Sequence, residues 1–161
     1  MSSDTPGLTS EQFRKAAGRF ATGVTIATVL DSTGRPHGLT VSSFTSVSLE
    51  PPLVLICLGH AAATLECFRT AKHFGINILA ADQRALSEHF ARKGHNRFHG
   101  IDWHPGETGV PLLPGTVAAM ECAVHRKIAM GDHDILVGEA VRLEIREKTP
   151  LVHYASRYHQ L

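Results

Sequence analysis

Features that would mark several classes of protein are scarce in this chain of 161 residues. It has only three cysteines, Cys57, Cys67 and Cys122, and no C-x-x-C pair, so neither a disulfide framework nor a cysteine-based metal site is expected. Each cysteine lies among apolar neighbours, as buried free thiols usually do. This usage fits a reducing compartment, and we expect a cytoplasmic protein.

Long apolar runs and an excess of either charge are also missing. The longest apolar run, residues 53–58, suits a buried strand and is far shorter than a membrane span. The 16 basic and 15 acidic residues are mixed along the chain, which disfavours both nucleic acid and an anionic membrane as partners. Residues 1–7 are polar, lack the apolar core of a signal peptide, and predict a flexible tail before a single domain at 8–161.

The order of the expected elements predicts a mainly β protein. Short turns between neighbouring strands favour an antiparallel sheet, and several strands with few helices favour a closed or split barrel with peripheral helices. Strands do not alternate regularly with helices, and no G-x-G-x-x-G is present, so a Rossmann fold is disfavoured. Helices are expected at 9–21, 62–72 and 82–92, strands at 24–30, 36–41, 53–58, 74–79, 117–128 and 135–147, a long loop at 93–115, and a closing segment at 150–158.

Local signals set the bounds of the helices. Thr9 and Gln12 form the pattern of a capping box, and Phe13 and Phe20 share one apolar face of the first helix. Asp82 is expected to cap the third helix.

Patterns of apolar residues set the burial of the strands. The continuous apolar run at 53–58 predicts a strand buried on both faces. Residues 117–128 and 135–147 alternate, with Glu121 expected on the polar face of the first, and with Leu143 and Ile145 on the apolar face of the second.

The stretch 38–52 is rich in Ser and Thr and carries no charge before Glu50. It follows a hairpin and precedes the apolar run at 53–58. On composition alone it is a solvated loop. Small side chains, hydroxyls and backbone N–H groups are also what the wall of a site for a flat ligand with a phosphate must offer.

Eleven histidines are many for this length, but they are spread over most of the sequence. His95 with His99, and Asp132 with His133 and Asp134, are the groups that a metal enzyme could use. No His pair lies on an evident helix with a carboxylate, and no quartet has zinc spacing. We therefore expect no metal.

From residue 13 to 161 the chain resembles the short-chain flavin reductases, through segments 13–24, 37–44, 46–54, 74–79, 87–91, 131–133 with 137–139, and 150–158. The resemblance implies an FMN-binding split barrel with Greek-key-like connections and a homodimer. It also implies an NAD(P)H:flavin oxidoreductase that supplies reduced flavin to a partner monooxygenase. FMN or FAD, and NADH or NADPH, stay open. The alternative is a non-enzymatic flavin-binding electron carrier on the same fold.

The resemblance also implies a flavin site, in which Thr40–Ser43 line the ring and two further segments contribute. Three of its members have plain structural alternatives: Thr64 as a helix cap, Asn77 as a buried amide, and Arg92 as an exposed cation at a helix end. Residues 60–63 depart from the more polar stretch usual in the family. The flavin-binding residues implied are Thr40, Val41, Ser42, Ser43, Ser46, Val47, Leu58, Gly59, Thr64, Asn77, Ser87, Phe90 and Arg92.

For the reductant, the resemblance places His133 against the nicotinamide, where a neutral imidazole can hydrogen-bond the carboxamide. Tyr158, with His159, is expected to cover the same site. The alternatives are a turn histidine bonded to backbone and a packed terminal tyrosine. Hydride transfer between two cofactors needs no side-chain acid or base, so no catalytic residue is assigned.

Overall fold

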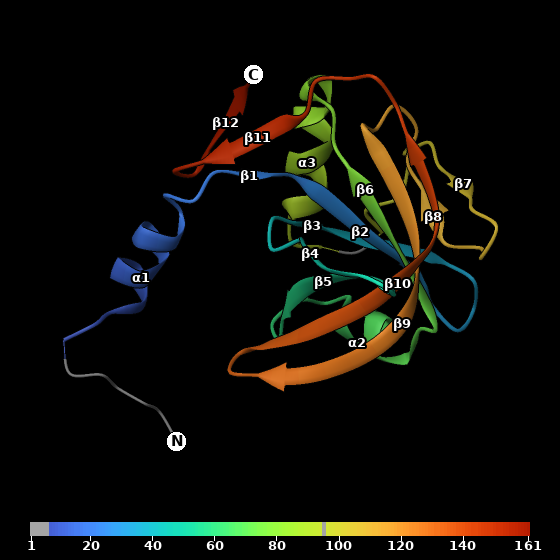
Figure 1. The fold of residues 1–161 in the computed structure, drawn as a ribbon, viewed down its shortest axis with the longest axis horizontal. Helices are drawn as coiled ribbons and strands as arrows, with labels where there is room; N and C mark the ends of the chain where they lie inside the picture. Colours follow the sequence, from blue (N-terminus) through green and yellow to red (C-terminus); the bar gives the residue numbers. More distant parts are fainter. Residues whose placement is uncertain (1–6, 95) are drawn as a thin grey trace.

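The computed structural model describes residues 7–94 and 96–161, so of the expected tail only Gly7 falls within it. The chain is mainly antiparallel β, which confirms the predicted class (Figure 1). Helices are α1 (Ser10–Ala17), α2 (Leu65–Thr70) and α3 (Arg84–Ala91), with a 3₁₀ turn η1 (Ala81–Gln83). Strands are β1 (Thr22–Gly23), β2 (Thr25–Leu30), β3 (Pro36–Val41), β4 (Thr45–Leu49), β5 (Pro52–Gly59), β6 (His73–Ile78), β7 (His104–Pro105), β8 (Pro111–Leu112), β9 (Ala118–Met130), β10 (His133–Ile145), β11 (Leu151–Tyr154) and β12 (Arg157–Gln160).

The main sheet has seven strands in the order β3-β2-β6-β9-β10-β5-β4. Its edge strands β3 and β4 do not pair with each other, so the sheet curls into a barrel that stays split. Inside it, Ile56, Phe74 and Ile76 are fully buried. A small sheet, β1-β11-β12, lies beside the barrel on the side of α1, and β7 and β8 form a separate two-stranded sheet (Figure 1).

The first helix begins as predicted but ends early. Thr9 and Gln12 form the capping box, with the Gln12 N–H donating to Thr9 Oγ1 at 3.1 Å. The helix ends at Ala17 rather than at residue 21, because the Arg19 and Phe20 N–H groups donate to the Ala16 and Ala17 carbonyls in tighter i→i−3 turns. Phe13 and Phe20 remain 64% and 79% exposed, so the predicted apolar face is not covered within one chain. Figure 1 shows α1 lying away from the barrel.

The other two helices are shorter than predicted. Helix α2 spans six residues, with Leu65 and Phe68 buried as expected. Asp82 lies inside η1 and does not cap α3, which was the predicted role. Gln83 instead accepts the Ala80 N–H at 2.9 Å and also donates to the Pro114 carbonyl at 2.9 Å, so it fixes the entry to α3.

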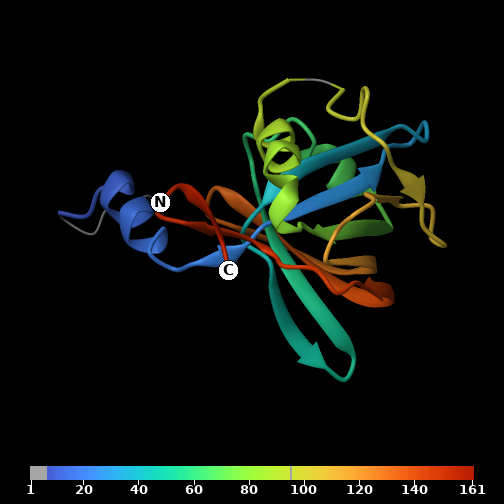
Figure 2. The same cartoon turned by 90° about the horizontal axis from the view of Figure 1, so that it is seen from above.

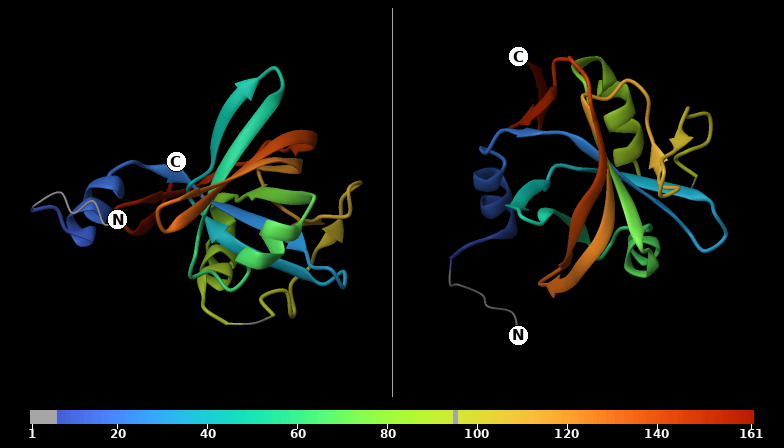
Figure 3. Two further views of the ribbon diagram at one scale, coloured as in Figure 1. Left: turned by 90° about the horizontal axis from the view of Figure 1, so that it is seen from below. Right: turned by 45° about the vertical axis from the view of Figure 1, so that its right-hand side comes forward.

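The hydroxyl-rich stretch contains a strand that the sequence did not predict. β4 pairs antiparallel with β5, and the resulting hairpin extends away from the barrel (Figures 2 and 3). β5 is not buried on both faces, contrary to the prediction: Val54, Ile56 and Leu58 are buried, while the alternating residues Leu53, Leu55 and Cys57 are only half-buried. One face of β5 therefore lines the core and the other lies near the surface.

Strand β9 is one residue longer than predicted, β10 has the predicted length but begins two residues earlier, and the two meet at a two-residue turn. Gly131 occupies that turn at φ +61°, a conformation that suits glycine. β10 consequently begins at His133, which pairs with both Met130 and Gly59. Towards its other end, Leu143 and Ile145 are 63% and 74% exposed, so the apolar face expected there is not covered within one chain.

The long loop 93–115 is held down by a carboxylate. Glu121 is buried rather than on a polar face as predicted, and it accepts the backbone N–H groups of Glu107 and Thr108 at 3.0 and 2.7 Å. The Thr108 hydroxyl donates to it as well. Burial raises the pKa of Glu121, but these donors outweigh that effect and hold the pKa below its usual value.

Glu121→Gln should lower the free energy of unfolding by about 2 kcal/mol at neutral pH, because the amide cannot accept all three bonds. The folded-state pKa is depressed, so this contribution is present above the unfolded-state pKa and is lost as pH falls through the folded value. Urea unfolding of both proteins at neutral pH and below about pH 4 checks this. If the difference in the free energy of unfolding between the two proteins is the same in acid as at neutral pH, the ionised Glu121 carboxylate does not stabilise the loop.

Within residues 7–94 and 96–161, no helix is both long and apolar enough to cross a bilayer. The same part of the chain holds no group of three His, Cys, Asp or Glu side chains placed to bind a metal ion. His95, which with His99 forms one of the two groups considered for a metal, lies outside the described residues.

Candidate functional site

Segments 40–43 and 59–64 lie side by side and form the frame of the site. Ser43 joins the first segment to β5, since its hydroxyl accepts the Cys57 N–H at 2.9 Å and donates to the Cys57 carbonyl at 3.1 Å. On the other side, the Thr40 hydroxyl donates to the Ser87 carbonyl of α3 at 2.6 Å. Two of the predicted hydroxyls therefore fix the segment rather than stand free.

A groove of about 890 Å³, including its open mouth, runs beside this frame. Its floor contains Leu39 and Thr40, and one wall is the run of three alanines at 61–63. Phe90 borders the groove, although its side chain is buried in the core, and Lys93 and Arg97 bring positive charge to the groove. An apolar wall of small side chains with cations nearby suits a flat aromatic ring that carries phosphate.

A second hollow, of about 410 Å³, continues from the first and shares Ala63, Gly94 and Arg97 with it. Thr64 lines this hollow and is only 8% exposed. Thr64 occupies the N-cap position of α2, but its hydroxyl makes no capping bond and has no hydrogen-bond partner among the residues that the structure describes, so the simple helix-cap alternative does not account for it. A buried hydroxyl without a partner is costly, and a ligand oxygen would satisfy it.

Arg97, which sequence reasoning missed, is the arginine at the groove. Its Nη1 donates to the Gly38 carbonyl at 2.8 Å and its Nε to the Arg92 carbonyl at 2.9 Å. Burial lowers the pKa of Arg97. Arg92 itself is exposed and lines neither hollow. The only signal in the sequence was that Arg97 falls in a long loop, which such sites often use.

His133 lies at the β10 end of the same frame. A side-chain carbon placed on Gly59 would be 3.6 Å from His133 Nε2, so the imidazole covers Gly59. Its Nδ1 lies 2.7 Å from Asp132 Oδ1. That contact is the main cause of the lowered pKa of Asp132. Because a carboxylate only accepts, Nδ1 carries the proton, and neutral His133 presents Nε2 as an acceptor.

Several expected flavin-binding residues are near the frame but point elsewhere. The side chains of Val41 and Leu58 are buried in the core, so only their backbones can face a ligand. Ser42 is exposed beside Ser43. Ser46 and Val47 are exposed on the projecting β4, away from the groove-lining residues.

Asn77 lies inside the barrel and not at a ring edge, because its amide is already bonded there. Its Nδ2 donates to the Ile26 carbonyl at 3.1 Å, and its Oδ1 accepts the Leu113 N–H at 2.9 Å. The buried-amide alternative therefore describes Asn77, whose role is to tie the long loop to β2.

Tyr158 pairs with Ser87 of α3, with Oη and Oγ 2.8 Å apart, and its ring packs against the core cluster that contains Phe90. Figure 1 places β12, which carries Tyr158 and His159, at the opposite end of the molecule from the β9–β10 turn. Within one chain, neither residue covers His133. The packed-tyrosine alternative describes Tyr158 in the single chain.

Comparison with known proteins gives the family. Residues 17–161 match the model of the flavin reductase like domain. The chain is 45% identical over 145 residues to the FMN reductase (NADH) SmoA of Agrobacterium fabrum, covering 90% of this chain and 82% of SmoA. It is 37% identical to HsaB, the reductase subunit of a flavin-dependent monooxygenase of Rhodococcus jostii, covering 91% of this chain and 75% of HsaB. Some relatives are longer, and the chain spans 46% and 54% of two from Rhizobium meliloti.

Solved structures agree with this result. The NADH:FAD oxidoreductase SgcE6 of Streptomyces globisporus, in complex with NAD and FAD fragments, superposes with a TM-score of 0.89 at 39% identity. The alignment covers 94% of this chain and 92% of SgcE6. The family model, the similar sequences and the similar solved structures agree: this chain belongs to the flavin reductase-like family.

Proposed function

We propose that this chain is an NADH-dependent flavin reductase that reduces FMN or FAD. The observation that carries the proposal is that segments 40–43 and 59–64 have a histidine near one end and a threonine with an arginine near the other. Segments 40–43 and 59–64 run from His133 at one end to Thr64 and Arg97 at the other. One end suits an uncharged carboxamide, and the other suits a phosphate.

The groove fits a flavin through shape and charge. Alanines 61–63 offer apolar surface to a ring face, and their small side chains permit close approach. The unpartnered Thr64 hydroxyl, with Lys93 and Arg97, would hold the phosphate. Hydride passes from nicotinamide C4 to flavin N5 when both are bound, and the protein contributes alignment and exclusion of water.

His133 orients the nicotinamide in this scheme. Asp132 keeps the proton on Nδ1, so Nε2 is free to accept a hydrogen bond from the carboxamide –NH₂. The imidazole neither gives nor takes a proton during transfer. Its contribution is the position of the reactive carbon relative to the ring.

A homodimer is part of the proposal, and two exposed apolar arms support it. Helix α1 carries Phe13, and Phe20 follows it in the next turn. The β4–β5 hairpin carries Val47 and Leu49, which are 51% and 89% exposed. Figures 2 and 3 show both arms extending from the barrel. A second copy of this chain would cover them, together with the half-buried face of β5.

Leu49→Lys should shift this protein from dimer to monomer by at least about tenfold in dissociation constant, because a charge would enter an apolar interface. The side chain is 89% exposed within one chain, so folding should be unaffected. Light scattering with size exclusion measures the mass. Ser32→Lys, at an exposed residue of the turn between β2 and β3 and on neither arm, is the control. A monomeric wild type, or a dimer unchanged by Leu49→Lys, would refute this assignment.

We further propose that the reduced flavin goes to a separate monooxygenase in the cytoplasm. The reductase subunit HsaB supports the partner class, and the three free cysteines support a reducing compartment. Steady-state loss of NADH absorbance, with FMN, FAD and riboflavin in excess over protein, tests the activity. NADPH is run in parallel. A non-enzymatic flavin carrier would bind flavin without repeated turnover, and that result would overturn the reductase.

A further inference from the structure

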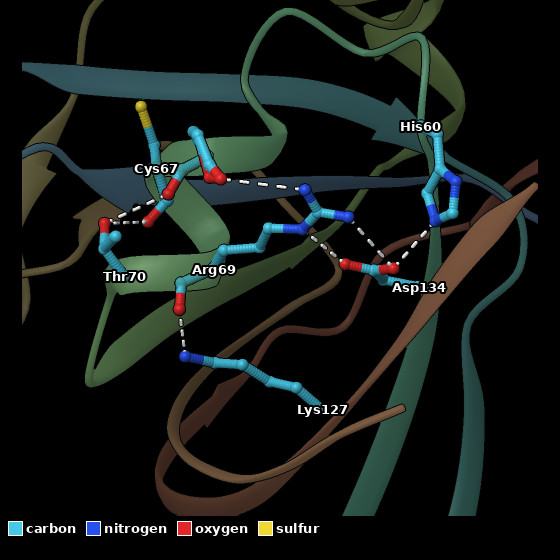
Figure 4. A network of polar contacts seen from close by, with 7 residues as sticks. His60, Cys67, Arg69, Thr70, Lys127 and Asp134 are labelled. Atoms are coloured by element: carbon cyan, nitrogen blue, oxygen red, sulfur yellow. Dashed lines mark hydrogen bonds and ion pairs between the residues drawn. The ribbon is translucent and has the colours of Figure 1, made fainter. Parts of the chain in front are cut away.

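A buried carboxylate behind the His133 turn joins four elements (Figure 4). Asp134, the second residue of β10, is 8% exposed. Its Oδ2 accepts Arg69 Nε at 2.7 Å, and its Oδ1 lies 2.8 Å from His60 Nε2 and 3.3 Å from Arg69 Nη2. The Arg69 carbonyl in turn accepts Lys127 Nζ from β9. The end of β5, α2, β9 and β10 are therefore linked at one point.

The strand geometry places this cluster directly behind His133. Consecutive residues of a strand point to opposite faces, so Asp134 faces the inside of the barrel while His133 covers Gly59 on the outer face. The His60 N–H also donates to the Asp132 carbonyl at 2.9 Å. Two separate links thus tie the 131–134 turn to His60.

His60 and Arg69 flank the wall of the groove. Residues 61–64 lie between His60 and α2, and α2 carries Arg69. None of His60, Arg69 and Asp134 lines either hollow. The carboxylate is shared between the turn that bears His133 and the two ends of the segment that bears Thr64. Arg69 is the main cause of the low pKa of Asp134, about 2, so the charge persists at all working pH values.

We propose that Asp134 is a positioning residue, which holds the His133 turn and the groove wall 61–64 in fixed relation through His60 and Arg69. This inference rests on the proposed function. It explains how His133, at the nicotinamide end, and Thr64, at the phosphate end, keep a fixed distance from each other. Removing a residue that orients a functional side chain through hydrogen bonds often lowers affinity or activity about 10-fold or more. The effect of removing Asp134 should therefore be measurable in NADH kinetics.

Asp134→Ala should raise KM for NADH about tenfold while kcat falls much less. If Asp134 acts through His133, the same change made in a His133→Ala background should alter KM for NADH less than about twofold. Glu66→Gln is the matched control. It removes the other carboxylate near Arg69, 3.6 Å away and 71% exposed, and should leave the kinetics unchanged.

Equal effects of Asp134→Ala in both backgrounds, or a lower melting temperature with wild-type KM, would overturn the proposal and leave Asp134 a structural residue. If Asp134→Ala does not fold, Asp134→Asn replaces it in the cycle. That variant keeps an acceptor for His60 but turns an –NH₂ towards Arg69, and an intermediate rise in KM is expected.

Amide hydrogen exchange gives a readout that does not need activity. The His60 amide donates to Asp132, so its exchange should speed up about tenfold in Asp134→Ala, while the Ile76 amide in central β6 should not change. If wild type fails to oxidise NADH, the proposed function is wrong. The exchange rate of the His60 amide then decides by itself whether Asp134 positions the turn and the groove wall. Unchanged exchange at His60 would reject it.

Discussion

His133→Ala should lower kcat/KM for NADH about 100-fold, which is the scale of loss when a reacting group is misplaced by about 1 Å. The variant removes the acceptor at Nε2 that Asp132 prepares for the carboxamide. Flavin affinity should stay within about twofold, because no flavin-phosphate group is lost at that end of the frame. Stopped-flow reduction at several NADH concentrations separates binding from transfer.

The control for this variant is His104→Ala. His104 is an exposed histidine of β7, in the long loop, and should leave NADH use unchanged. Folding is not at risk at His133, whose side chain is 48% exposed. Wild-type kinetics for His133→Ala would remove this residue from the mechanism. An equal loss of flavin affinity would instead place the flavin ring, not the nicotinamide, against it.

Arg97→Met should weaken FMN binding about 10- to 100-fold, since charge-assisted hydrogen bonds contribute roughly 1.5–3 kcal/mol. Riboflavin, which has no phosphate, should bind the variant about as well as it binds wild type. Fluorescence titration with the two flavins measures both affinities. The pair separates loss of a phosphate contact from damage to the groove.

Arg92→Met is the matched control for Arg97→Met, because Arg92 is five residues away, exposed, and outside both hollows. It should leave FMN affinity within about twofold. An equal loss for FMN and riboflavin in Arg97→Met would mean that Arg97 acts only by holding the Gly38 carbonyl. If only Arg92→Met lost FMN affinity, the phosphate would bind at Arg92, at the end of α3, as the resemblance implies.

The mainly β class and most of the strands along the chain could be predicted from the sequence because they depend on local periodicity. Residues 36–41 form the expected strand, and the capping box of Thr9 and Gln12 is present. Bounds were less predictable where a tight turn decides them. The i→i−3 turns at Arg19 and Phe20 end α1, and the turn at Gly131 lets β10 begin two residues earlier than its apolar pattern indicates.

The site was harder to predict, because its parts are set by tertiary contacts. Nothing in a strand-borne Asn shows whether its amide will face a ligand or, as Asn77 does, the backbone of β2 and the long loop. Arg97 reaches the groove only because the loop folds back onto Gly38. The placement of segment 40–43 in the flavin site stays a prediction of the resemblance, while the direction of each side chain needed the structure.

The exposed apolar faces of α1 and β10 are the clearest case of a pattern with no explanation inside one chain. Phe13, Leu143 and Ile145 follow the periodicity of buried faces, yet each is exposed. The pattern indicates burial but does not say against which molecule. A second copy is the partner that we propose.

Amide hydrogen exchange of wild type, with and without ligand, tests most directly that one frame holds both substrates. FMN should slow exchange at residues 40–43 and 59–64, and NAD⁺ added to the FMN complex should slow it further at 131–134. Residues 104–112 serve as the internal reference and should not change. Protection by FMN confined to segments other than 40–43 and 59–64 would contradict the site described above.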